Sequence, residues 1–569
     1  MKKRYRLPVA AFLAVAGIAA VWLLAGIYFE TNDDRLIGEI YSGAMTGSPN
    51  GHSFYVNDLL GIPVSFLYRI AGNVAWYGYL LVFLQGLSWF AIANALLSSE
   101  GGLPAKAGYF CVLFACGFYF IANIQFTTTA ALLALAGYLC LFLHREEKKG
   151  LVCFFVLELL ALLLRDKAML LMQPFGMAVF GSETLVKLVQ HKNAEKGEEH
   201  SPVSSASIRF FALAGGLLAL ALFLGYGTKF LSYGTSEEWK EYQKINDAVT
   251  VITDYTGIPE YESVREILDR YGVSEKQYAA FFQYVMLDEN LSGDCLLEIA
   301  EVASANRVDP SVADILSQTF GSYLDGQFFR TNLVVLAAWI LTILVVFFGA
   351  ARELLLPMAG IFAARSVDWF FLLYQGRTPA RVLMPLHFAE LALLLYLCLR
   401  VYLCAGKVGR MGQRVFLAAA LGLVALSSAI TLFEQYRHTD EVNKGQKILI
   451  ESLVEVQEYC DRHPENRYVL EMGTTIYQRG SAFENRLYHP VNYLITGCWY
   501  SGAPGLNEHI ADYLDSAGEV YLITSPELPI QAETVKAYFA EKYGEEARLF
   551  DSFTTSVGAE YEVYAFPAR

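Results

Sequence analysis

The sequence predicts an α-helical membrane protein that crosses the bilayer many times. Its 569 residues are 55% hydrophobic, with a mean hydropathy of +0.35, as is typical of integral membrane proteins. Apolar windows long enough to span the hydrocarbon core occur about eleven times. They cover residues 7–29, 76–98, 106–123, 126–143, 150–164, 168–187, 208–228, 331–350, 353–373, 381–403 and 414–433. The net charge of −14 at pH 7 excludes a broadly basic, nucleic-acid-binding surface. The acidic residues should lie in extramembrane segments, because the predicted spans are nearly uncharged.

The first window, 7–29, follows the basic residues Lys2, Lys3, Arg4 and Arg6. Its apolar run is longer than the core of a signal peptide, so we interpret it as an uncleaved anchor. Because positively charged flanks remain in the cytoplasm, this helix should begin inside and end outside.

The same orientation suits the rest of the chain. The basic connections His144–Lys149 and Lys407–Arg414 then fall on the cytoplasmic side, as the positive-inside rule requires. We therefore expect a multi-pass protein of the plasma membrane with a cytoplasmic N-terminus and an extracytoplasmic C-terminus. The expected domains are an N-terminal transmembrane region (1–228) with a catalytic first outer loop (30–58), an outer helical insertion (229–330), C-terminal transmembrane helices (331–433) and an outer α/β domain (434–569).

The C-terminal segment mixes strand-like and helix-like stretches. Arg467–Glu471, Glu519–Thr524 and Glu562–Phe566 have strand patterning, and Ala532–Tyr543 has the apolar spacing of an amphipathic helix. This alternation predicts a small α/β domain.

Most of the nine cysteines lie in apolar runs, where they are expected to pack in the core. Only Cys295, Cys460 and Cys498 fall in polar regions, so we expect at most one disulfide, between Cys460 and Cys498. No Cys/His cluster has the spacing of a zinc site.

Two adjacent carboxylates, Asp33 and Asp34, directly follow the first window. Two neighbouring carboxylates repel, so the pKa of one should rise. That suits a general base that takes a proton from a hydroxyl, or a ligand for a divalent metal such as Mg²⁺ or Mn²⁺. The alternative interpretation is a solvated loop start in which Asp34 pairs with Arg35.

The rest of the first outer loop is rich in glycine and polar residues, and loops of this length are usually functional or disordered. Aromatic residues such as Tyr55 argue against disorder and can stack on sugar faces. We predict that His52, Tyr55 and Asp58 contact the acceptor or its sugar, with a surface or capping role for His52 as the alternative. The apolar stretch Leu59–Ile70 is too short to span the membrane and is expected to form an interfacial or re-entrant helix.

An anion site is predicted at Arg377-Thr378-Pro379-Ala380-Arg381. Thr378 suits an N-cap and Pro379 the first helical position, so a membrane helix should begin there. Its free N–H groups, with Arg377 and Arg381, could bind a phosphate. The alternative is a pair of interfacial arginines that snorkel.

A second basic turn, Arg165-Asp166-Lys167, joins two apolar windows. Arg165 and Lys167 could add a phosphate contact, or the turn could simply hold an internal ion pair. Glu158 lies in the preceding window, where an unpaired acid is costly, so we expect a polar partner on a neighbouring helix.

The layout resembles the GT-C superfamily of membrane glycosyltransferases, which use polyprenyl-phosphate-linked sugars. The resemblance lies in one helix, a long outer loop that opens with Asn32-Asp33-Asp34, many further spans and an outer C-terminal domain. In that superfamily an early acidic residue of this loop is the catalytic base or a metal ligand, which the resemblance implies for Asp33 and Asp34. It likewise implies that Arg377 and Arg381 bind the lipid phosphate.

The sequence therefore predicts a GT-C-like glycosyltransferase that moves a sugar from a polyprenyl-phosphate carrier to an extracytoplasmic glycan or lipid acceptor. The expected partners are the lipid-linked donor, this acceptor and the bilayer, with no nucleic acid. The alternatives are a transporter or flippase of lipid-linked glycans, a polysaccharide polymerase or ligase of another fold, and a non-catalytic membrane protein with an outer binding domain. Transporters usually show repeats and charges near the bilayer midplane, whereas most charges here lie at helix ends.

Overall fold

The computed structural model describes residues 3–99, 102–144, 147–194, 203–287, 290–325, 328–348, 351–405, 411–475, 477–486, 492–515 and 519–567. The chain forms two compact units. Unit 1 consists of Met1–Ile27, Leu80–Gly227 and Pro310–Glu441, and unit 2 consists of Tyr28–Tyr79, Thr228–Asp309 and Val442–Arg569. Both units are therefore assembled from three separate stretches of sequence.

The prediction of a polytopic helical membrane protein is confirmed. Within the described residues, 9 helices are long and apolar enough to cross a membrane. They are α1 (Arg6–Ala25), α4 (Trp76–Ser98), α7 (Phe126–Leu143), α9 (Asp166–Ala194), α10 (Val203–Lys229), α16 (Thr331–Phe348), α17 (Leu355–Gln375), α18 (Ala380–Ala405) and α19 (Met411–Asp461). The predicted windows at 106–123 and 150–164 correspond to shorter helices, α5 (Leu103–Cys116) and α8 (Lys148–Leu164).

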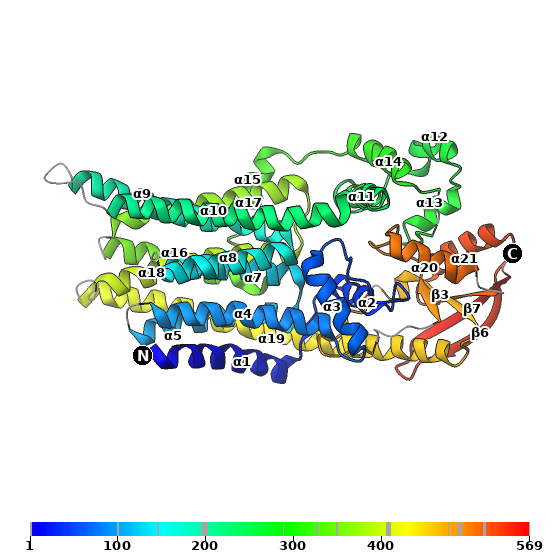
Figure 1. The fold of residues 1–569 in the computed structure, drawn as a ribbon, viewed down its shortest axis with the longest axis horizontal. Coiled ribbons are helices and arrows are strands. Elements are labelled where there is room, and N and C mark those ends of the chain that lie inside the picture. Colours follow the sequence, from blue (N-terminus) through cyan, green and yellow to red (C-terminus); the bar gives the residue numbers. More distant parts are fainter. Residues whose placement is uncertain are drawn as a thin grey trace. The chain divides into compact units, whose positions relative to one another are not determined.

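The core of unit 1 is built around α7, whose residues are all buried. Its sequence is apolar on every side, which is the pattern of a helix surrounded by other helices. Helices α8, α9 and α18 pack against it, and the four run side by side within this unit (Figure 1). Glu158 of α8 has the polar partner that the sequence argument required, because Gln173 Nε2 of α9 donates to Glu158 Oε2 at 3.0 Å.

Unit 2 contains a helical layer formed largely from the 229–330 segment. Its helices are α11 (Glu237–Thr250), α12 (Tyr261–Tyr271), α13 (Glu275–Phe281) and α14 (Gly293–Ala305), which share an apolar core with the π-helical turn η3 (Val251–Thr256). The last helix of this segment, α15 (Val312–Gly321), belongs to unit 1. The helical character predicted for this segment is therefore confirmed.

The first of the three stretches of unit 2 contributes two short helices, α2 (Asn32–Ser42) and α3 (Asp58–Ile70), which pack on each other. Helix α3 exposes apolar side chains at helical spacing, including Ile62, Phe66 and Ile70. This stripe is the pattern expected of the interfacial helix that the sequence predicted at Leu59–Ile70.

The C-terminal part of unit 2 is an α/β domain with a five-stranded sheet in the order β4-β3-β5-β7-β6. Its elements are β3 (Arg467–Leu470), β4 (Tyr493–Ile495), α20 (Pro504–Asp515), β5 (Glu519–Thr524), α21 (Pro529–Tyr543), β6 (Arg548–Thr554) and β7 (Glu560–Pro567). Strand β3 is parallel to β4 and β5, whereas β7 is antiparallel to β5 and β6. Apolar residues of α21 and of the central strands form one core on this sheet.

The predicted disulfide is wrong, because Cys460 and Cys498 are both free and buried. Cys460 lies at the end of α19, whereas Cys498 lies in the turn after β4. The sulfur of Cys498 is engaged in that turn, where it accepts a hydrogen bond from the Tyr500 N–H at 3.3 Å.

Candidate functional site

The acid pair lies in the first turn of α2, not in a loop as the sequence suggested. Thr31 precedes the helix in an extended conformation, and Gly43, with a φ of 89°, ends it in the left-handed region that glycine adopts readily. Carboxylates in a first helical turn interact favourably with the positive end of the helix dipole. The two acids are therefore placed where the helix dipole stabilises their negative charge.

The two acids differ in environment. The side chain of Asp34 is 0% exposed, and it accepts hydrogen bonds from the Tyr77 hydroxyl at 2.9 Å and from the Thr31 hydroxyl at 3.4 Å. Asp33 is half-buried. Arg35, which the alternative interpretation paired with Asp34, forms an ion pair with Glu39 at 3.4 Å. Asp34 is thus held by hydrogen bonds, and Asp33 is the more exposed of the two acids.

Asp33 and Asp254, a half-buried residue of η3, act electrostatically on the same side chain, Tyr284. Burial raises the pKa of Tyr284, and the negative charges of Asp254 and Asp33 raise it further. Both carboxylates therefore lie near the same phenol. Asp254 and Tyr284 were not predicted from the sequence, because neither belongs to a recognisable motif. Their relation to Asp33 depends on how η3 packs.

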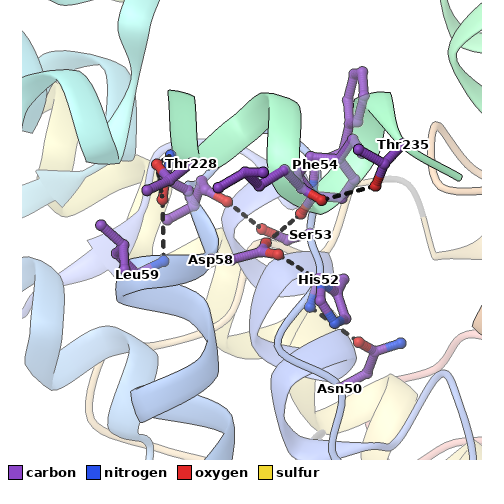
Figure 2. Close-up of polar contacts among 12 residues, drawn as sticks. Asn50, His52, Ser53, Phe54, Asp58, Leu59, Thr228 and Thr235 are labelled. Atoms are coloured by element: carbon purple, nitrogen blue, oxygen red, sulfur yellow. Dashed lines mark hydrogen bonds and ion pairs between the residues drawn. The ribbon is translucent and has the colours of Figure 1, made fainter. Parts of the chain in front are cut away.

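A second polar cluster lies at the start of α3 (Figure 2). Asp58 is in the first helical turn, and the side chain of the preceding N-cap residue, Asn57, accepts the Leu59 N–H. Asp58 Oδ2 lies 2.7 Å from His52 Nδ1, and Asp58 Oδ1 accepts a hydrogen bond from the Tyr233 hydroxyl. Because a carboxylate only accepts, Nδ1 of His52 carries the proton, which leaves Nε2 as the basic nitrogen of the neutral ring.

The hydrogen bond to Asp58 raises the pKa of His52 above its ordinary value of 6.5, although partial burial opposes this shift. Asp58 is 5% exposed, whereas His52 is partly open to a cleft of about 680 Å³ in unit 2. The cleft is lined by Thr46, Gly47, Ser48, Pro49, Asn50, Gly51, His52, Ile62, Ser65, Phe66, Arg69, Gly505, Glu508, His509 and Asp512. The loop before α3, α3 itself and α20 therefore form its walls.

Of the three predicted acceptor contacts, only His52 lines this cleft. Asp58 lies behind it as its hydrogen-bond partner. The ring of Tyr55 lies 4.7 Å from that of Trp499, and its hydroxyl is within hydrogen-bonding distance of Asn246, at 3.1 Å from Nδ2. Tyr55 thus connects the loop to α11 through Asn246 and to the turn after β4 through Trp499. The acceptor-binding role of these residues stays a prediction.

The four predicted phosphate contacts all belong to unit 1. Arg377 and Arg381 are half-buried at the turn into α18, which begins at Ala380, one residue later than predicted. The guanidinium of Arg165 lies 5.3 Å from the centre of the Phe126 ring, and Lys167 is exposed in the first turn of α9. Their binding of phosphate stays a prediction.

A divalent metal at Asp33 and Asp34 also stays a prediction. In the part of the chain that the structure describes, no group of three or more His, Cys, Asp or Glu side chains is arranged to hold a metal ion. Both oxygens of Asp34 already accept hydrogen bonds from protein hydroxyls.

The structure also contains ionisable residues inside the membrane helices of unit 1. Arg365 of α17 and Glu390 of α18 are 0% exposed and form an ion pair of 3.8 Å. Among the described residues, Asp368 Oδ2 and His387 Nδ1 are buried without a hydrogen-bond partner. In the sequence, these four residues are polar interruptions of apolar windows. Their burial inside membrane helices counts against the expectation that most charges lie at helix ends, which is the sequence argument against a transporter.

We expect Asp58→Asn to lower the pKa of His52, because a neutral amide cannot stabilise the imidazolium. The raised pKa means that the His52–Asp58 pair stabilises the fold most below pH 6.5, and that this contribution is lost as the pH rises through the raised value. The variant should therefore lose stability mainly at the lower pH. NMR titration of labelled histidine measures the shift. Asp512→Asn is the control: burial lowers the pKa of His509, the Asp512 carboxylate partly opposes this, and its amide should change the titration of His509 but not that of His52. An unchanged His52 titration in Asp58→Asn would contradict the assignment.

The fold and these sites define a polytopic helical membrane protein with two polar sites in unit 2. No family model matches the chain, and no curated protein matches it. Among solved structures, the crystal structure of ArnT from Cupriavidus metallidurans bound to undecaprenyl phosphate aligns with 97% of this chain and 97% of that chain, at 13% identity and a TM-score of 0.36.

Proposed function

We propose that this protein is a GT-C-like glycosyltransferase that moves a sugar from a polyprenyl-phosphate carrier to a glycan or lipid acceptor. One observation carries the proposal. Directly after the first membrane helix, a half-buried carboxylate, Asp33, stands beside a fully buried and hydrogen-bonded one, Asp34. An acid in such a place is costly unless it is used, and it suits proton transfer. The resemblance of the sequence to that superfamily points to the same reaction.

In this reaction Asp33 takes the proton of an acceptor hydroxyl while the hydroxyl oxygen bonds to the anomeric carbon of the sugar. The bond between that carbon and the phosphate oxygen breaks, and its electron pair leaves on polyprenyl phosphate. Asp34 is a positioning residue, because its hydrogen bond with Tyr77 fixes the first turn of α2.

The leaving phosphate needs positive charge to stabilise it, and guanidinium groups bind phosphate through paired N–H donors. Arg377 and Arg381 are the proposed contacts, with Arg165 and Lys167 as a second set. The first pair flanks the start of α18, where the positive end of the helix dipole favours an anion. We expect Arg381→Ala to weaken donor capture, seen mainly as a raised KM.

Lipid analysis of cells tests this function. A strain that lacks the protein should accumulate a sugar-linked polyprenyl phosphate and lose one glycan modification, and the wild-type gene should restore both. Mass spectrometry of the lipid extract identifies the donor sugar at the same time. An unchanged pool of lipid-linked sugars in the deleted strain would contradict the proposal.

The proposed reaction also requires unit 2 to lie outside the cytoplasm. We expect a cysteine placed at the exposed position Glu508 to react with a maleimide that cannot cross the membrane, because an odd number of spans separates it from a cytoplasmic N-terminus. A cysteine at Glu147, in a predicted cytoplasmic connection, should react only after permeabilisation. Labelling of the wild-type chain measures the background from its native cysteines. The reverse pattern would invert the topology and remove the site from the outer face.

A further inference from the structure

The cleft beside His52 has walls of mixed chemistry. Glu508 and Asp512 of α20 contribute carboxylates, and Arg69 of α3 contributes a guanidinium. Arg69 donates one hydrogen bond to the Pro49 carbonyl at 3.1 Å, and a guanidinium has further N–H groups to offer. A ligand that forms hydrogen bonds with these side chains must donate to the carboxylates and accept from the guanidinium.

The His52 ring adds a constraint of its own. Its Nδ1 faces Asp58, so Nε2 is the ring nitrogen that remains for a ligand in the cleft that His52 lines. This nitrogen accepts a hydrogen bond when the ring is neutral and donates one when it is charged. The hydrogen bond to Asp58 raises the pKa of His52 and so favours the charged ring. A hydroxyl group suits both states, since it can donate and accept.

One wall of the cleft is apolar. Ile62 and Phe66 of α3 are 51% and 57% exposed and line it. An exposed aromatic ring next to carboxylates suits the face of a sugar ring, whose C–H groups are apolar and whose hydroxyls lie at its edge. A phosphate would face two carboxylates, and an ammonium group would face Arg69, so neither fits these walls as well.

We propose that this cleft binds a glycosyl group through its hydroxyls, with Phe66 beneath the sugar ring and His52 Nε2 on one hydroxyl. As the acceptor subsite it rests on the transfer reaction proposed above, but the binding itself needs no catalysis. Asp58 positions His52, and Gly47 keeps the opposite wall open. A Cβ at Gly47 would lie 2.7 Å from His509 Nδ1, and the φ of 70° at Gly47 would strain any other residue.

Photo-crosslinking in living cells tests the proposal. With p-benzoylphenylalanine at position 66, we expect a glycan-bearing adduct that mass spectrometry can identify. A lipid attached to the glycan would show that the sugar is a glycolipid head group, and its absence would show a soluble glycan; either supports the subsite. The same probe at Ile70, which is 68% exposed on the same helix but does not line the cleft, should yield no such adduct.

Variants in the crosslinking background test whether the side chains of the cleft hold the sugar. His52→Phe removes the hydrogen bond but keeps a ring, and it should reduce the glycan adduct about tenfold, as loss of a hydrogen bond worth about 1–2 kcal/mol predicts. Gly47→Ala should reduce it as well, whereas His463→Phe, the same change at an exposed histidine that does not line the cleft, should leave it unchanged. Thermal unfolding confirms that each variant is folded. Glycan adducts that persist in His52→Phe, equal adducts at both positions, or only phospholipid or protein adducts at position 66 would overturn the proposal.

Discussion

Asp33→Asn is expected to reduce sugar transfer by about 10²- to 10⁴-fold, the usual cost of losing a general base. The amide keeps the shape of the side chain but cannot accept the proton of the acceptor hydroxyl. Because Asp33 is half-buried, the variant should fold normally. Steady-state transfer in membranes that contain equal amounts of each variant measures the effect, with kcat falling and the KM for the donor nearly unchanged.

Asp34→Asn is the matched comparison, because it makes the same chemical change one residue away. Asp34 is buried and accepts two hydroxyl hydrogen bonds, so its amide should lower stability by about 1–3 kcal/mol as well as lower activity. Asp254→Asn tests the second carboxylate near Tyr284 in the same assay. If Asp33→Asn transferred sugar at the wild-type rate, Asp33 would not be the base.

Arg365→Met is expected to be the most destabilising single change in unit 1, at about 3–5 kcal/mol. The guanidinium donates to the Thr319 carbonyl at 2.5 Å and pairs with Glu390, and all of these groups are buried. Glu390 also accepts hydrogen bonds from Tyr323 at 2.5 Å and from Trp339 at 2.7 Å. Removing Arg365 therefore leaves a buried carboxylate without its counter-charge and frees the segment that contains Thr319.

Unfolding of the purified protein in detergent measures this loss. Arg352→Met is the matched control, since Arg352 is exposed and its replacement should change the unfolding temperature little. The double variant Arg365→Met with Glu390→Gln should recover part of the stability, because the uncompensated charge is then gone. A single variant as stable as the wild type would show that the buried pair does not hold these helices together.

The membrane fold was predictable because its signal is local. Apolar runs of sufficient length identify membrane helices without reference to their neighbours. The strand Glu519–Thr524 was predicted with its observed bounds, since it is an almost continuous apolar run. Strand β6, Arg548–Thr554, was missed because most of its residues are exposed and its sequence lacks the pattern of a half-buried strand.

The candidate sites were only partly predictable. Asp33 and His52 stand out in the sequence by their place after the first membrane helix. Asp254 does not, because its approach to Asp33 depends on the packing of η3, which no local pattern encodes. Arg365 and Glu390 could have been found, since charged residues inside apolar windows are costly and therefore informative.

The most direct test of the proposed transfer uses the purified protein in lipid nanodiscs with the sugar-linked polyprenyl phosphate that accumulates in the deleted strain. Mass spectrometry follows free polyprenyl phosphate and glycosylated acceptor over a single turnover. The wild type should release polyprenyl phosphate and form product in equal amounts, whereas Asp33→Asn should bind the donor with similar affinity and release almost none. Donor that remains intact with the wild type in the presence of acceptor, or equal release by Asp33→Asn, would contradict the account.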